Sequence, residues 1–165
     1  MPVAQRITPC LWFDDRALPA AEFYTSIFKK SKIGKISRYG EAGREIHGKP
    51  AGSVMTVAFE LDGQAFTALN GGPVFRFTEA ISLQIDCESQ KEVDYYWDKL
   101  SEGGDDKAQQ CGWLKDRYGL SWQVVPRALI ELMSDPDPEK SGRVMEAMLR
   151  MKKIDIAGLE RAAAG

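Results

Sequence analysis

Polar side chains alternate with apolar ones along several segments of the chain, and they are the best placed residues to bind or act on a molecule. Side chains at alternate positions of a β-strand lie on the same face, so each segment would present its polar groups together. The candidate ligand-binding residues are Thr8, Cys10, Trp12, Asn70, Ser82, Gln84, Ser121 and Gln123. A few convergent polar groups in an apolar cavity are typical of small-molecule sites. In the alternative interpretation, these side chains only satisfy one another or an internal water molecule.

Two further residues carry potentially reactive groups. His47 is the only histidine and so the obvious acid–base group near neutral pH, but it lies in the glycine-rich segment 40–52. We interpret it as a solvated loop residue, with a catalytic role on a lid as the alternative. Cys10 would be a nucleophile only if a neighbouring cation lowered its pKa. No cation is close in sequence, which favours an inert buried thiol.

The composition is that of an ordinary globular protein, with 165 residues of which 44% are hydrophobic and 28% charged. A formal net charge of -2 with scattered basic residues gives no reason to expect nucleic acid. No apolar run approaches the roughly 20 residues of a membrane-spanning helix, and no secretory signal is recognisable. The three cysteines are widely separated and form no CxxC pair. We therefore expect a cytoplasmic protein with reduced thiols.

The first half of the chain predicts a strand, a helix and three further strands. Residues 7–13 predict a strand, and Pro19 suits the first turn of a helix that continues to Phe28. Residues 33–39 predict a second strand, followed by an exposed connection over 40–52. Residues 53–61 and 64–70 predict two strands joined by a two-residue turn at Asp62-Gly63.

The same order begins again in the second half. A strand over 80–86 precedes Ser89 and Glu92, whose spacing predicts a capping box at the start of a helix. Residues 112–116 and 120–125 predict a hairpin around Asp116 to Gly119, and helices follow, the last one capped by Asp155. The predicted fold class is α+β. Two βαβββ modules, about 5–73 and 78–126, form curved half-barrel sheets in a single domain, 1–165, with a short helical C-terminal tail, 127–165.

This order resembles the vicinal oxygen chelate superfamily, which includes glyoxalases and bleomycin-resistance proteins. The chain also contains the phrases LWFDD, EFYTSIF, FTALNGGP, AISLQIDC, CGWLKDRYGLSWQVVP and MKKIDIAGLERA. These phrases resemble those of the PhnB-like branch of the superfamily, which is often labelled demethylubiquinone methyltransferase. They are spread over nearly the whole chain, and the resemblance implies one glyoxalase-like domain.

The resemblance also implies where a divalent metal would bind. In the superfamily, ligands project into the cup from the first, fourth, fifth and eighth strands. At these places the chain offers Thr8 on the first strand, Ala80 or Ser82 on the fifth and Gln123 on the eighth. On the fourth strand it offers Gln64, Phe66, Ala68 or Asn70, in a register that the sequence leaves open by one residue. None of them is a histidine or a carboxylate, the residues that usually bind such ions. We therefore predict no metal and no other cofactor.

Three classes of function remain. The first is a small-molecule-binding protein, or a metal-independent enzyme of unassigned reaction, that uses the half-barrel cup. The second is a metal-dependent lyase, isomerase or dioxygenase. The third is a methyltransferase, as the family label suggests, although the turn after the first strand, from Phe13 to Ala17, contains no glycine.

A homodimer is also expected. Half-open sheets leave strand edges that need partners. The tail carries an apolar stripe at Val144, Met145, Met148 and Leu149. The expected partners are thus an unknown small molecule and a second copy of the chain, without nucleic acid or membrane.

Overall fold

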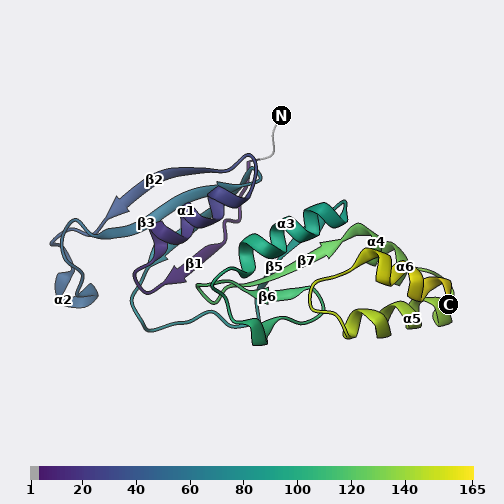
Figure 1. Ribbon diagram of the computed structural model, residues 1–165. Coiled ribbons are helices and arrows are strands. Elements are labelled where there is room, and N and C mark those ends of the chain that lie inside the picture. The colour runs from purple at the N-terminus through teal and green to yellow at the C-terminus, as the bar shows by residue number, and fades with distance from the viewer. Residues whose placement is uncertain (1–3) are drawn as a thin grey trace. The chain divides into compact units, whose positions relative to one another are not determined.

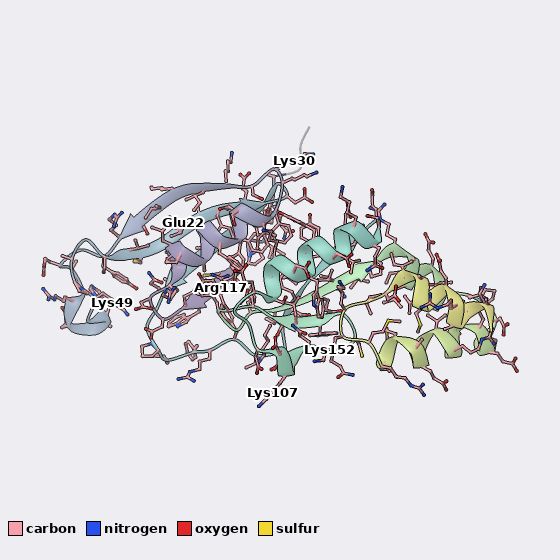
Figure 2. All side chains as sticks on the ribbon, in the orientation of Figure 1. Glu22, Lys30, Lys49, Lys107, Arg117 and Lys152 are labelled. Atoms are coloured by element: carbon pink, nitrogen blue, oxygen red, sulfur yellow. The ribbon has the colours of Figure 1, made fainter. Side chains whose placement is uncertain are left out.

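The computed structural model describes residues 4–165, and the chain divides into two compact units, Met1–Arg76 and Phe77–Gly165. In each unit a long helix covers one face of a small β-sheet (Figure 1). No helix within residues 4–165 is long and apolar enough to cross a membrane. Charged side chains cover the outside of the units, as the labelled Glu22 and Lys107 illustrate (Figure 2).

The first unit is a four-stranded sheet whose elements follow the predicted βαβββ order. They are β1 (Cys10–Phe13), α1 (Ala17–Ile27), β2 (Lys32–Arg38), the short α2 (Arg44–His47), β3 (Val54–Leu61) and β4 (Gln64–Asn70). The strand order is β1-β4-β3-β2, with β1 parallel to β4 and the other pairs antiparallel. Asp62 and Gly63 both have positive φ, which confirms the predicted two-residue turn between β3 and β4.

Aromatic side chains form the centre of the first unit. The fully buried Tyr24 of α1 stacks on Phe59 of β3 with ring centroids 6.3 Å apart, and Phe59 stacks on Phe66 of β4 at 5.4 Å. Leu11 and Phe13 of β1 are also buried, so alternate residues of β1, β3 and β4 face the helix. The opposite face of this sheet is left open by α1.

The second unit has three strands. Its elements are β5 (Ser82–Cys87), α3 (Gln90–Ser101), the 3-10 helix η1 (Asp106–Ala108), β6 (Trp113–Lys115) and β7 (Ser121–Pro126). The strand order is β5-β7-β6, with β5 parallel to β7 and β6 antiparallel to it. Among the described residues, a fourth strand before β6 is not formed, which corrects the predicted second βαβββ order. The segment there, GGDDKAQQ, lacks alternating apolar residues, and Asp105 Oδ1 accepts from the N–H of Lys107 to form η1 instead.

Local signals position α3 as predicted. Ser89 Oγ accepts from the N–H of Glu92 at 3.3 Å, and Glu92 Oε2 accepts from the N–H of Glu88 at 2.8 Å. These bonds confirm the capping box. The helix then buries Val93, Trp97 and Leu100 on the side that meets the sheet.

Three helices follow β7 and pack mainly on one another. They are α4 (Arg127–Met133), α5 (Pro138–Leu149) and α6 (Ile156–Ala164). Their shared core consists of Leu129, Val144, Ile154, Leu159 and Ala163, with Met148 packed against it. Of the stripe that suggested a dimer, Met145 and Leu149 remain 45% and 52% exposed. The other half of the stripe is thus used inside the chain.

Hydrogen bonds connect this helical tail to the rest of the second unit. The N–H groups of Cys111 and Gly112 donate to the carbonyls of Met151 and Lys152 at 2.8 and 2.7 Å. Gln90 of α3 accepts from the N–H of Ile156 at 2.8 Å and so caps α6. Asp155, the predicted cap, makes no side-chain capping bond. The tail is therefore an integral part of this unit.

Candidate ligand-binding site

The face of the second sheet opposite α3 gathers most of its polar side chains. Across the three strands, two rows of paired residues are formed. One row is Ser82 of β5, Ser121 of β7 and Lys115 of β6, and the other is Gln84, Gln123 and Trp113. Residues paired in this way lie on one face. We call this set the polar face: Ser82, Gln84, Trp113, Lys115, Ser121 and Gln123. Four of the predicted site residues are thus brought together here.

Gln123 is the centre of a hydrogen-bonded row on the polar face. Its Nε2 donates to Ser82 Oγ at 2.8 Å, and its Oε1 accepts from Gln84 Nε2 at 3.3 Å. Both ends of the amide are engaged, so its orientation is fixed. Gln84 is exposed, which leaves its amide accessible to a bound molecule.

Ser121 lies next to this row and is 1% exposed. Within residues 4–165, its hydroxyl has no hydrogen-bond partner. Buried polar groups are almost always hydrogen-bonded, and leaving one unpaired is costly. The unpaired hydroxyl therefore marks a place where a ligand or a water molecule would bond.

Lys115 contributes a positive charge to the polar face. Its Nζ lies 2.6 Å from Glu79 Oε1, and its side chain is only 26% exposed. The hydrogen bond from Lys115 lowers the pKa of the Glu79 carboxyl below its ordinary value. Sequence reasoning missed both Lys115 and Trp113 as site residues. The signal was present, because the predicted hairpin already placed the segment 112–116 opposite 120–125.

A buried carboxylate holds this hairpin in register. Asp116 Oδ1 accepts from the N–H groups of Tyr118 and Leu120 at 2.8 and 3.1 Å, and Oδ2 accepts from Trp122 Nε1 at 2.8 Å. Aspartate often closes a turn by bonding to the backbone two residues on. Asp116 therefore fixes the pairing of Lys115 with Ser121 on the polar face.

The remaining predicted site residues belong to the first sheet. Cys10 and Trp12 pair with Thr67 and Leu69 of β4 on the face that α1 leaves open, whereas Thr8 is exposed and precedes β1. The register predicted for the fourth strand is open by one residue, and the structure shifts it by one: Phe66 and Ala68 are buried toward α1 with Asn70, so Thr67 and Leu69 face the open side.

Asn70 has a structural role in the first unit. Its Oδ1 accepts from the N–H of Ala17 at 2.8 Å, and its Nδ2 donates to the carbonyl of Val54 at 3.1 Å. The amide therefore joins the start of α1 to β3, and both of its ends are engaged by the backbone. This corrects its assignment to the cup.

Trp12 packs against the turn that follows β4. Its Nε1 donates to the carbonyl of Gly72 at 2.9 Å, and its ring meets Phe75 edge to face at 4.9 Å. A Cβ at Gly71 would lie 2.2 Å from Cζ2 of Trp12, so the indole rests directly on the backbone there. Only glycine fits at this position.

We expect Gly71→Ala to lower the free energy of unfolding by about 1–3 kcal/mol, the usual cost of overpacking. The matched control is Gly40→Ala, because a Cβ at Gly40 meets no heavy atom within 4 Å. Urea unfolding followed by tryptophan fluorescence measures both variants. Equal midpoints for the two would contradict the packing of Trp12 on Gly71.

A family model for 3-demethylubiquinone-9 3-methyltransferase matches residues 5–125 of the chain. The chain belongs to this family. It is 36% identical to a solved structure of the family, the PhnB protein from Bacillus cereus, over 74% of this chain and 99% of that one, with a TM-score of 0.64. No curated protein sequence matches the chain. The family match ends at residue 125, so α4, α5 and α6 lie outside it.

More distant structures agree with this placement in the fold. A protein from Pseudomonas aeruginosa is 19% identical over 74% of this chain and 98% of its own, with a TM-score of 0.56. The fosfomycin resistance protein FosX from Listeria monocytogenes, solved with Mn(II) and sulfate, is 15% identical over 75% and 90%, with a TM-score of 0.50. These likenesses confirm the vicinal oxygen chelate fold for this family member.

The residues of this family member do not fit the divalent metal that the fold implies. The polar face offers hydroxyls, amides and the ammonium group of Lys115, and the one carboxylate beside it, Glu79, is already bonded to that ammonium at 2.6 Å. On the first sheet, the polar groups of the open face include Cys10, Thr56, Thr67 and Glu60. The single carboxylate among them, Glu60, is paired with Lys32 at 3.8 Å. No group of three or more His, Cys, Asp or Glu residues within positions 4–165 is placed to bind a metal ion. Such ions need imidazoles, carboxylates or thiolates in combination.

The two residues singled out for reactivity are not set up for catalysis. Cys10 is exposed, which corrects its predicted burial, yet partial desolvation of the thiol raises its pKa above the ordinary value. His47 is half-buried rather than solvated. Its Nδ1 accepts from the N–H of Lys49 at 2.8 Å, its Nε2 lies 3.2 Å from the carbonyl of Ala42, and its ring lies 4.6 Å from that of Tyr39. Contacts of its own loop thus occupy both ring nitrogens.

Proposed function

We propose that this chain binds a polar small molecule on the polar face of its second sheet, without a metal ion. It acts there as a binding protein or as an enzyme of unassigned reaction. The observation that carries the proposal is the row Ser82–Gln123–Gln84 beside the buried, unpaired hydroxyl of Ser121. A ligand that bonds to this hydroxyl removes an unfavourable feature of the free protein.

The chemistry of the polar face supports a ligand with several hydrogen-bonding groups. Amides present donors and acceptors in fixed directions, and hydroxyls serve as either. The half-buried Trp113 adds an apolar surface beside Gln123. This combination of few polar groups with an apolar wall is what small-molecule sites usually contain.

A survey of small molecules that co-purify with the native protein tests this proposal. The wild-type protein should carry a molecule that mass spectrometry detects and that Gln123→Leu loses. Gln64→Leu is the matched control, because Gln64 is an exposed strand residue of the first sheet. Retention of the same molecule by Gln123→Leu would contradict the proposal.

Methyl transfer is the alternative that the name of the family favours. Free backbone N–H groups at the start of a helix bind anions such as the carboxylate of S-adenosylmethionine, and the first strand–helix turn is one place that could offer them. In this chain the N–H of Ala17, the first residue of α1, is already bonded to Asn70. We therefore expect calorimetry to detect no binding of S-adenosylmethionine, and a stoichiometric binding heat would favour the methyltransferase instead.

Metal content separates the proposal from metal-dependent superfamily chemistry. Because the polar face holds an ammonium group and neutral side chains, we expect no stoichiometric transition metal in the untagged protein after dialysis. Elemental analysis measures this directly. About one zinc, iron, nickel or manganese ion per chain would contradict a metal-independent site on the polar face.

We also propose that the chain forms a homodimer. Both sheets are open, and their edge strands β1, β2, β5 and β6 each have only one strand partner among the described residues. Ile130, Met145 and Leu149 add exposed apolar surface on the helical tail. Light scattering coupled to size exclusion should give about twice the chain mass of 18.4 kDa. A mass near that of a single chain would refute the dimer.

A further inference from the structure

We propose that the ligand of the polar face carries an anionic oxygen group, a carboxylate or a phosphoryl group. This group binds between Lys115 and Ser121 and displaces Glu79 from the lysine. The inference rests on the proposed function, since it names the chemistry of the molecule bound at that site.

The sheet register places the two binding groups next to each other. Lys115 of β6 and Ser121 of β7 are directly opposite in an antiparallel pair, and Ser82 pairs with Ser121 from the other side. The Cβ atoms of such pairs are roughly 4.5–5.5 Å apart, so one oxygen-rich group can reach both the ammonium and the hydroxyl. A charge-assisted bond to Lys115 would be the stronger of the two contacts.

Ser121 is the observation that points to a ligand here. Its side chain is buried on the polar face and its hydroxyl is unpaired among the described residues. A hydroxyl can donate to an anionic oxygen without any change of protonation. An anion held by Lys115 would therefore supply the partner that Ser121 lacks.

Glu79 already places a carboxylate at the lysine. It lies in a turn before β5, and its side chain is 62% exposed. An ion pair with one largely solvated partner contributes little stability, so its exchange for another anion is inexpensive. Asp86 is the acidic residue of β5 that lies on the same face as Ser82 and Gln84. Its carboxylate is already paired with Arg127 at 2.8 Å. Glu79 is therefore the competitor that a ligand anion must displace from Lys115.

A titration of the full-length protein with inorganic phosphate and with acetate tests the inference. Nuclear magnetic resonance follows the backbone amides of Lys115 and Ser121, with chloride keeping the ionic strength constant. Saturable shifts of the amide signals are expected for at least one anion. Tighter binding of phosphate would indicate a phosphoryl site, and tighter binding of acetate a carboxylate site. The absence of saturation for both anions would overturn the inference.

Variants with opposite expected effects make the test specific. Lys115→Met should weaken anion binding roughly tenfold or more, and Ser121→Ala roughly two- to tenfold. Glu79→Gln removes the competitor and should tighten binding roughly two- to fivefold. Lys107→Met on the exposed η1 is the control and should change nothing.

Two results separate this inference from the proposed function. If Gln123→Leu loses the co-purifying molecule while Lys115→Met retains it, the ligand is not held as an anion and the inference is wrong. If Glu79→Gln weakens anion binding, the displacement of Glu79 is wrong as well. Neither result would affect the assignment of the ligand to the polar face.

Discussion

Asp116→Asn is expected to lower the free energy of unfolding by about 3 kcal/mol. The carboxylate is buried and accepts from the N–H groups of Tyr118 and Leu120 and from Trp122 Nε1. Hydrogen bonds to charged groups contribute roughly 1.5–3 kcal/mol each. An asparagine has only one acceptor oxygen, and its NH₂ group cannot accept a hydrogen bond. The variant therefore loses either the bonds from the N–H groups of Tyr118 and Leu120 or the bond from Trp122 Nε1.

Chemical denaturation of Asp116→Asn and Asp98→Asn measures this effect. Asp98 is exposed on α3, so its variant removes the same charge without breaking a buried contact. Because Asp116 sets the register of β6 against β7, its variant should also lose ligand affinity, whereas Asp98→Asn should not. A change of less than about 0.5 kcal/mol, the range of neutral surface substitutions, would show that the carboxylate does not hold the hairpin.

Gln123→Ala should weaken the ligand by about 1–3 kcal/mol, the range for leaving a buried polar partner unsatisfied. The amide orients both Ser82 and Gln84, so its removal disturbs three groups of the polar face at once. Calorimetry with the molecule identified in the survey gives the affinity, and circular dichroism checks the fold. Unchanged affinity in a folded variant would remove Gln123 from the site.

Local signals in the sequence predicted the elements that depend only on local chemistry. The turn at Asp62-Gly63 needs positive φ at two residues, and the capping box needs two side chains three residues apart. Both are properties of a few consecutive residues. The α+β class and the first βαβββ order followed from such local signals, and strand alternation indicated the residues that form the row on the polar face.

Features that depend on long-range contacts were not predictable in the same way. Both faces of β4 carry apolar residues, since Ala65 and Leu69 lie on one face and Phe66 and Ala68 on the other. Periodicity alone therefore left its register open, and the packing of α1 decided it. Likewise, Gln90 caps α6 from a helix 66 positions away in sequence, which no local pattern around Asp155 indicates.

Lys115 was missed because a lysine in a short strand is ordinarily solvated. The predicted hairpin already placed Lys115 opposite Ser121, but its ion pair with Glu79 is formed only in the folded chain. Ser121 lies opposite it, and Glu79 reaches it from the turn before β5. The polar row and the place of Lys115 beside it could thus be inferred from strand alternation and the hairpin, whereas the pairing of Lys115 with Glu79 required the structure.

The location of ligand binding can be measured directly from the side-chain amide signals of glutamine and asparagine in nuclear magnetic resonance. On addition of the molecule found in the survey, we expect the amide signals of Gln84 and Gln123 to shift in a saturable manner. The signals of Asn70 and Gln64 should stay unchanged, because Asn70 is held by backbone groups and Gln64 lies at the turn of the first sheet. Shifts confined to Asn70, or constant signals for Gln84 and Gln123, would contradict a binding site on the polar face.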